Sequence, residues 1–149
     1  MTRRRVFWAL TALWLLFIWG HSLMPASVSK EESHHWLALL QTWLPWLTDY
    51  LIRKAAHFTE YAVLGALLFG AAGVRHGLWF PPCFGLLAAL LDETLQLFAA
   101  GRSGQVSDVW LDLAGFLTGW VVVGGIAYFL RKRKKYHHLF YLLYFSKDT

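Results

Sequence analysis

Four long apolar runs divide the chain, and each is about as long as a membrane span. They occupy residues 6–23, 55–74, 78–100 and 109–130. A helix of about 20 residues rises about 30 Å, which matches the hydrocarbon thickness of a bilayer. Alternation of apolar and polar positions, the mark of a half-buried strand, is absent from these runs. The pattern predicts an all-α fold, a four-helix transmembrane bundle that forms a single membrane domain over residues 1–149.

A shorter apolar segment lies between the first two runs. Residues 34–47 carry three tryptophans and are too few to cross a bilayer. Tryptophan favours the headgroup level of a membrane, and Pro45 interrupts the helical pattern. We therefore expect a short interfacial amphipathic helix between spans 1 and 2, broken at Pro45.

Proline and glycine positions agree with the helical interpretation. Pro81 and Pro82 fall in the first turn of the third run, where a missing backbone N–H does little harm. Gly65, Gly115 and Gly119 lie along helix faces, and small residues at such places let membrane helices approach closely.

The composition is that of a membrane protein. Apolar residue types make up 57% of the chain and charged types 15%, against about 45–50% and about 25% in ordinary soluble domains. The mean hydropathy is +0.41. This composition excludes a disordered chain and disfavours a soluble enzyme. Because Cys83 is the single cysteine, the chain can form no internal disulfide.

Basic residues mark the two ends of the chain and set its orientation. Residues 3–5 and 131–135 are basic blocks beside apolar runs, which is typical of membrane flanks and not of a nucleic-acid partner. Four spans put both termini on one side, together with the turn at residues 75–76. Most of the 14 Lys and Arg residues then lie on the side of the two termini. Four lie on the opposite side: Lys30, Arg53, Lys54 and Arg102. The positive-inside rule then places both termini in the cytoplasm, with residues 131–149 as a basic and aromatic cytoplasmic tail.

Polar side chains inside the spans carry the functional information. A charge at the bilayer centre costs about 2.5–3.5 kcal/mol on insertion scales, so such residues are rare and usually functional. They are His57 and Glu60 in the second run, Asp92, Glu93 and Gln96 in the third, and Asp108 and Asp112 in the fourth. Helical rise places Glu60 about 10 Å below Arg53 and Glu93 about 10 Å below the end of its span. Three helices therefore contribute to one polar layer in the outer third of the membrane.

The residue types in this layer suggest a phosphate site. Arg53, Lys54 and Arg102 are expected to bind an anion at the rim, such as the polyprenyl-linked or other phosphate headgroup of a membrane lipid. The deeper residues divide by chemistry. Carboxylates suited to a divalent cation such as Mg²⁺ are Asp92, Asp108 and Asp112, and the candidates for acid–base catalysis are His57, Glu60 and Glu93.

Three motifs in this layer resemble those of a known family. They are Arg53-Lys54-x-x-His57-Phe58-x-x-Tyr61, then Asp92-Glu93-x-x-Gln96, then Arg102-x-x-x-x-x-Asp108 leading to Gly115. In this order and spacing they resemble the VanZ-like family of bacterial membrane proteins, over about residues 51–119. The resemblance adds Tyr61 to the polar site, which already includes Gln96. The chain departs from the family pattern at Asp112, where members usually carry asparagine.

The resemblance implies a multi-pass protein of the bacterial cytoplasmic (inner) membrane that is linked to the cell envelope. The namesake member is associated with resistance to teicoplanin, an antibiotic that acts outside the membrane. Whether the protein is an enzyme stays open, as does its oligomeric state.

Two other functions use the same residues. A non-enzymatic envelope factor would use the polar cluster only to hold the bundle together, through pairs such as Arg53 with Asp108, Arg102 with Glu93, and His57 with Asp112. A small proton-coupled transporter would use the buried acids as a relay, although the chain shows no internal repeat.

Overall fold

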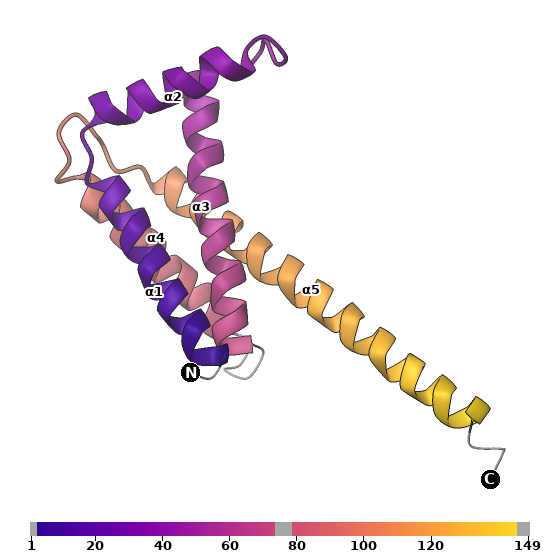
Figure 1. Cartoon of the computed structure of the whole chain (residues 1–149). Coiled ribbons are helices and arrows are strands. Elements are labelled where there is room, and N and C mark those ends of the chain that lie inside the picture. The colour runs from indigo at the N-terminus through magenta and orange to yellow at the C-terminus, as the bar shows by residue number, and fades with distance from the viewer. Residues whose placement is uncertain (1–2, 74–78, 146–149) are drawn as a thin grey trace.

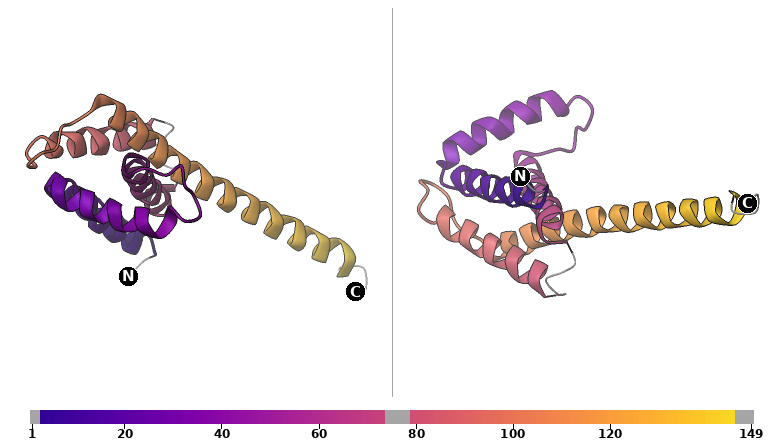
Figure 2. Two further views of the ribbon diagram at one scale, coloured as in Figure 1. Left: turned by 90° about the horizontal axis from the view of Figure 1, so that it is seen from above. Right: turned by 60° about the horizontal axis from the view of Figure 1, so that its bottom comes forward.

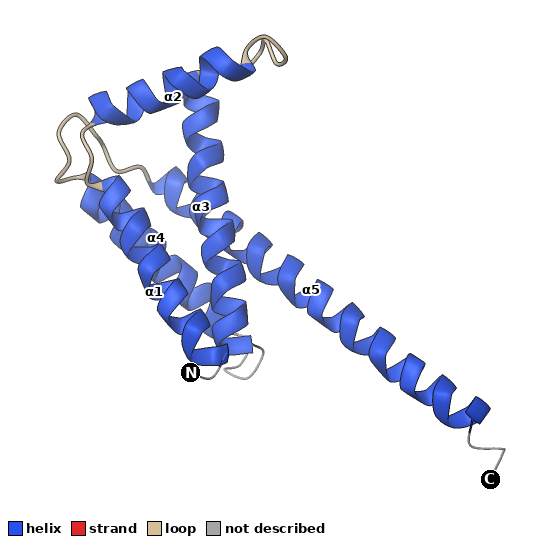
Figure 3. Cartoon of the chain, viewed as in Figure 1, coloured by secondary structure: helices blue, strands red, loops and turns tan. Residues whose placement is uncertain are grey.

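The computed structural model of the chain describes residues 3–73 and 79–145 (Figure 1). Its elements are α1 (Arg3–Ser22), α2 (Ala26–Leu40), α3 (Asp49–Ala72), α4 (Phe80–Gln96) and α5 (Val106–Phe145). Figure 3 shows that the described parts of the chain contain helices and loops but no strand. The predicted all-α class is confirmed.

Four of the described helices pack against one another, and α2 lies across one end of this group, which is called the bundle below. α1, α3, α4 and the first part of α5 pack together, with the largest interface between α3 and α5. α2 turns away from α1 by 105° and crosses one end of the bundle, close to the start of α3 (Figure 1). The first turn of α1 and the last turn of α5 lie on the side away from α2. Figure 2 shows from two further directions that α5 continues well beyond the other helices.

The helices begin and end where local chemistry allows. α3 starts at Asp49 and not at residue 55, because the Thr48 side chain accepts a hydrogen bond from the Leu51 N–H (3.3 Å) and caps the helix. α4 begins at Phe80, has Pro81 and Pro82 in its first turn, as expected, and ends at Gln96. α5 does not stop at residue 130 but runs through the basic block. Lys and Arg are good helix formers, so a charged stretch need not end a helix. The turn predicted at residues 75–76 lies outside the described residues.

The predicted boundaries of the surface helix, residues 34–47, were wrong. α2 begins after Pro25 and ends at Leu40, so it includes Lys30, Glu31 and Glu32 and stops before Pro45. Lys and Glu have high helix propensity and extend the helix toward its N-terminus. The tryptophan-rich part beyond Leu40 forms turns that leave Trp43 83% exposed.

Two described helices are long and apolar enough to cross a membrane: α3 and the Val106–Arg133 part of α5. α1 and α2 meet the same requirement only as a bent pair, which would make a third span. α4 has 17 residues, or about 25 Å of helical rise. The count of spans supported by helix length and composition is therefore two or three.

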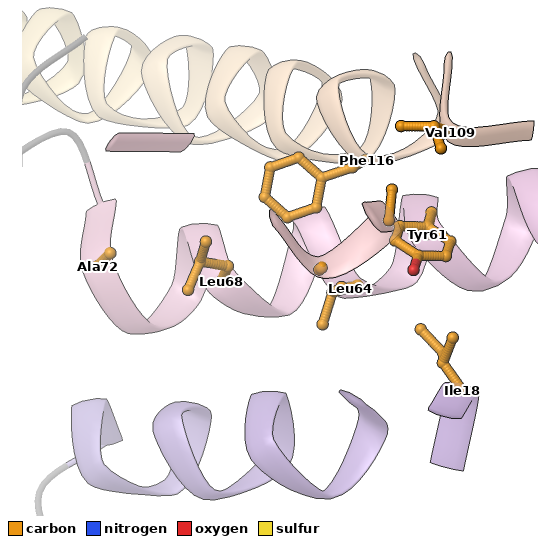
Figure 4. Packing of buried hydrophobic residues seen from close by; sticks show 9 residues of the cluster. Ile18, Tyr61, Leu64, Leu68, Ala72, Val109 and Phe116 are labelled. Carbon is orange, nitrogen blue, oxygen red and sulfur yellow. The ribbon is translucent and has the colours of Figure 1, made fainter. Parts of the chain in front are cut away.

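The hydrophobic core lies where α1, α3, α4 and α5 meet. Its fully buried large side chains are Ile18, Tyr61, Leu64, Leu68 and Phe116, all of which are labelled in Figure 4. The ring of Phe116 on α5 lies 6.1 Å from that of Phe84 on α4. Exposed apolar side chains such as Leu13, Leu87 and Val121 face outward from the bundle instead.

Glycines bring α3 and α5 into backbone contact. A Cβ atom added at Gly119 would lie 1.8 Å from the Ala62 carbonyl oxygen, and one at Gly115 would lie 2.4 Å from that of Phe58. From the other side, a Cβ at Gly65 would lie 2.0 Å from the Phe116 carbonyl oxygen. The close approach predicted from these glycines is confirmed.

Gly119→Ala is expected to lower the free energy of unfolding by about 1–3 kcal/mol, the usual cost of overpacking a tight contact. Gly125→Ala is the matched control on the same helix, because nothing lies within 4 Å of a Cβ there. Thermal unfolding of the purified protein in detergent, followed by circular dichroism, checks the pair. Equal stability of the two variants would contradict the close helix contact.

Candidate functional site

The polar layer lies at the end of the bundle that α2 crosses. α3 contributes its first half, α4 its last turn, and α5 its first two turns. The loop from α4 to α5 passes beside the start of α2, where the Ala26 N–H donates to the Ala100 carbonyl oxygen at 3.0 Å. Gly101 allows this turn, since its φ of +73° falls in the left-handed region that favours glycine. The loop and α2 together border the layer.

Three side chains from three helices meet at the bottom of the layer. The His57 Nδ1 atom lies 3.8 Å from Asp92 Oδ2 and 4.0 Å from Asp112 Oδ1. Both aspartates are completely buried, at 0% exposure. We call His57, Asp92 and Asp112 the buried triad.

Several polar atoms of the buried triad lack partners. His57 Nδ1, Asp92 Oδ1 and both carboxylate oxygens of Asp112 are buried without a hydrogen bond to any described residue. The Tyr61 hydroxyl, one turn after His57, is also buried and unpaired within the described chain. Buried polar groups are normally paired, because leaving one unpaired costs about 1–3 kcal/mol. The triad is therefore an exception that calls for a functional explanation.

Gln96 and Glu93 form hydrogen bonds near the end of α4. Gln96 Nε2 donates toward Asp92 Oδ2 and Glu93 Oε1, each at 3.4 Å. Glu93 Oε2 accepts a hydrogen bond from the Gln105 N–H at 2.6 Å, just before α5 begins. Glu93 therefore fixes the α4–α5 connection and faces the loop.

Above the triad, a cavity of about 250 Å³ opens at the surface of the layer. We call it the rim cavity; the charged and polar residues that line it include Arg53, Lys54, His57, Gln96, Arg102 and Asp108. Lys54 Nζ and Asp108 Oδ1 form an ion pair across α3 and α5. Arg53 and Arg102, by contrast, form no ion pair within the described ranges, and Arg53 Nε and Arg102 Nη2 are buried without hydrogen-bond partners there. Partial burial lowers the pKa of the Arg102 guanidinium, and the charge of Asp92 opposes that shift.

Glu60 belongs to a separate group on the α1 side of α3. Glu60 Oε1 lies 3.1 Å from His21 Nδ1, and Glu32 Oε2 lies 3.0 Å from His21 Nε2. These three residues border a second cavity of about 850 Å³ between α1, α2 and α3. The Trp14 indole N–H donates to the Glu60 carbonyl oxygen at 2.8 Å and holds α1 against α3.

The structure brings some of the expected site residues together and separates others. His57, Asp92 and Asp112 converge, while Asp108 pairs with Lys54 nearer the surface. Residues that the sequence did not single out are His21, Glu32 and Gln105. His21 lies near the end of α1, level with the polar layer, and its partners depend on the bend between α1 and α2.

Comparison with known protein families identifies the family of this chain. The family model described as VanZ/LLP1 matches residues 7–130. The chain belongs to the VanZ/LLP1 family. The match extends well beyond residues 51–119, where the motifs lie, and covers α1 and the apolar part of α5. Neither the curated proteins nor the solved structures gave a significant match. Family membership and the span-capable helices together make this a VanZ-like membrane protein.

The motifs of this VanZ/LLP1 protein form the polar layer. Arg53 and His57 of the first motif, Gln96 of the second and Arg102 of the third all line the rim cavity. Phe58, also in the first motif, presents its carbonyl oxygen to Gly115, which follows the third. The motif residues thus both border the cavity and set the spacing between α3 and α5.

A double-mutant cycle should show coupling between Lys54 and Asp108. We expect Lys54→Gln and Asp108→Asn each to destabilise the protein, and the double variant to lose less than the sum, with a coupling energy of about 1 kcal/mol. The Lys54 and Asp108 side chains are each 18% exposed, so solvent screens part of their attraction and keeps the coupling energy moderate. The cycle with Arg53→Gln and Asp108→Asn is the control and should give coupling near zero. Stronger coupling to Arg53 than to Lys54 would contradict the pairing.

Proposed function

We propose that this VanZ/LLP1 protein binds the phosphate headgroup of a membrane lipid, such as a polyprenyl phosphate, in the rim cavity. The observation that carries the proposal is the pair Arg53 and Arg102. Each lines the cavity, each is partly buried, and each has a buried N–H without a partner among the described residues. Unpaired guanidinium donors at the edge of a cavity are suited to an anion that arrives from outside.

Phosphate, the anion common to membrane lipid headgroups, fits these donors. A guanidinium presents a planar fork of N–H groups that matches two phosphate oxygens. Lys54 contributes less, because Asp108 already neutralises it. The cavity is small and mainly polar, so it would accept a headgroup and leave the acyl or prenyl chain in the surrounding lipid.

We further propose a topology of four spans in the bacterial cytoplasmic membrane, with both termini cytoplasmic and the rim cavity on the outer side. α4 is short, but exposed Leu97 and Phe98 extend its apolar surface beyond the helix end. The basic residues at the start of α1 lie at the end of the bundle opposite α2 (Figure 1). An outer rim cavity would give access to envelope lipids and is consistent with a contribution to teicoplanin tolerance.

A structural role for the polar layer is the second candidate function. Two observations favour it: the ion pair of Lys54 with Asp108, and the contact of His21 with Glu60. Such contacts join α3 to α5 and α1 to α3. Acid–base roles for His57, Glu60 and Glu93 remain predictions, and the side chains of Glu60 and Glu93 are engaged by His21 and by the α4–α5 loop.

Vesicles containing polyprenyl phosphate test the headgroup proposal. We expect Arg53→Gln and Arg102→Gln each to weaken binding by tenfold or more, since a hydrogen bond to a charged group contributes about 1.5–3 kcal/mol. Binding of the purified full chain is measured with chelator present, so that metal plays no part. Arg133→Gln, far along α5, is the matched control and should bind like the wild type.

The same variants separate the two candidate functions. If both arginine variants bind as tightly as the wild type, the headgroup proposal is wrong. If neither they nor the wild type binds the lipid, and the variants only lower thermal stability, the structural role is favoured.

Cysteine labelling tests the topology. In a Cys83→Ser background, Ser103→Cys and Glu31→Cys should react with a membrane-impermeant maleimide in spheroplasts. Arg133→Cys should react only after the membrane is permeabilised, because it lies at the opposite end of the bundle. The reverse pattern would place the rim cavity on the cytoplasmic side and remove its access to outer-leaflet lipids.

A further inference from the structure

We propose that the buried triad binds a divalent transition-metal cation, such as Zn²⁺, below the rim cavity. His57 would donate Nδ1, and Asp92 and Asp112 would each donate a carboxylate oxygen. The proposal goes beyond headgroup binding. It rests on side chains deeper than the two arginines, and a metal could bind here without any lipid.

The first argument is that two carboxylates are buried side by side without an ion pair to a lysine or arginine among the described residues. Asp92 and Asp112 are 0% exposed, and two carboxylates this close repel each other strongly when ionised. The nearby lysine, Lys54, is already paired with Asp108. A shared proton, a protonated His57 or a bound cation would each relieve this repulsion, and a bound cation would also satisfy the oxygens that accept no hydrogen bond within the described residues.

Geometry is the second argument. The three donor atoms all lie within 4.8 Å of one another. Ligands at about 2.0–2.2 Å from a cation are separated by at most about 4.4 Å, so small side-chain rotations complete the site. The donors come from α3, α4 and α5, whose backbones are held by the glycine contacts and by Phe116. The Tyr61 hydroxyl or a water molecule from the rim cavity would complete the coordination.

The donor set selects the kind of metal. An imidazole nitrogen with two carboxylates suits Zn²⁺ or Mn²⁺, whereas Mg²⁺ prefers oxygen ligands and keeps several waters. The set also differs from the all-carboxylate group of Asp92, Asp108 and Asp112 that the sequence suggested. Asp108 is engaged by Lys54, and His57 takes its place.

Cobalt provides a direct readout, because Co²⁺ substitutes for Zn²⁺ and its visible absorption reports its ligands. The full chain is purified in detergent, treated with chelator, desalted and titrated with Co²⁺. We expect one Co²⁺ per chain, displaced by Zn²⁺ and retained in excess Mg²⁺. His57→Gln, Asp92→Asn and Asp112→Asn should each weaken Co²⁺ binding by tenfold or more, since even changes outside the ligand shell cost about 10–100-fold.

Asp49→Asn is the matched control, since it removes a carboxylate about two turns before His57 on the same helix, outside the polar layer, and should bind Co²⁺ like the wild type. Circular dichroism and gel filtration show which variants are folded. The wild-type titration decides the question even if a triad variant fails to fold. A chain that binds no Co²⁺ or Zn²⁺, or an Asp112→Asn variant with unchanged affinity, overturns the proposal. Because lipid binding is measured in chelator and metal binding without lipid, either proposal can fail alone.

Discussion

The contact between α3 and α5 determines what the rest of the polar layer can do. Gly115 and Gly119 of α5 lie against the carbonyl oxygens of Phe58 and Ala62, closer than any side chain would allow. Phe58 is adjacent to His57, and Gly115 comes three residues after Asp112. The backbone contact therefore brings His57 and Asp112 to within 4.0 Å. In lipid, where apolar surface gives little drive for helix association, close packing of this kind provides much of the attraction.

Each acid of the layer meets the cost of burial in a different way. Asp108 has Lys54, Glu60 has His21, and Glu93 accepts the Gln105 N–H. Each of these contacts joins two parts of the structure and needs no ligand. Within the described residues, the only hydrogen bond to Asp92 or Asp112 is a long one from Gln96 to Asp92. If the polar layer had only a structural role, Asp92 and Asp112 would be expected to have partners before its other acids, because they are the most deeply buried. The contrast is the reason to assign the triad a role of its own.

Hydrophobic periodicity predicted the helical class and the gathering of the polar residues at one end of the packed helices, because both depend only on helical rise and on the cost of charge in lipid. It did not predict which side chains meet. Adjacent residues on a helix are turned by about 100° from each other, so Arg53 and Lys54 face different neighbours, and only the packing of α3 on α5 shows that Lys54 reaches Asp108. Likewise, the partners of His21 depend on the bend between α1 and α2. The helix ends were missed where capping by Thr48 or helix-forming charged residues extended a helix past its apolar part.

His57 links the two proposed binding sites. It lines the rim cavity, while its Nδ1 atom faces the two buried carboxylates. A cation bound by the triad would fix the imidazole and place positive charge beneath the cavity, which favours an anion at Arg53 and Arg102. Thermodynamic linkage makes this coupling reciprocal, so a phosphate in the cavity would tighten metal binding by the same factor. Headgroup recognition in this VanZ/LLP1 protein would then depend on the state of a site that the headgroup does not need to touch.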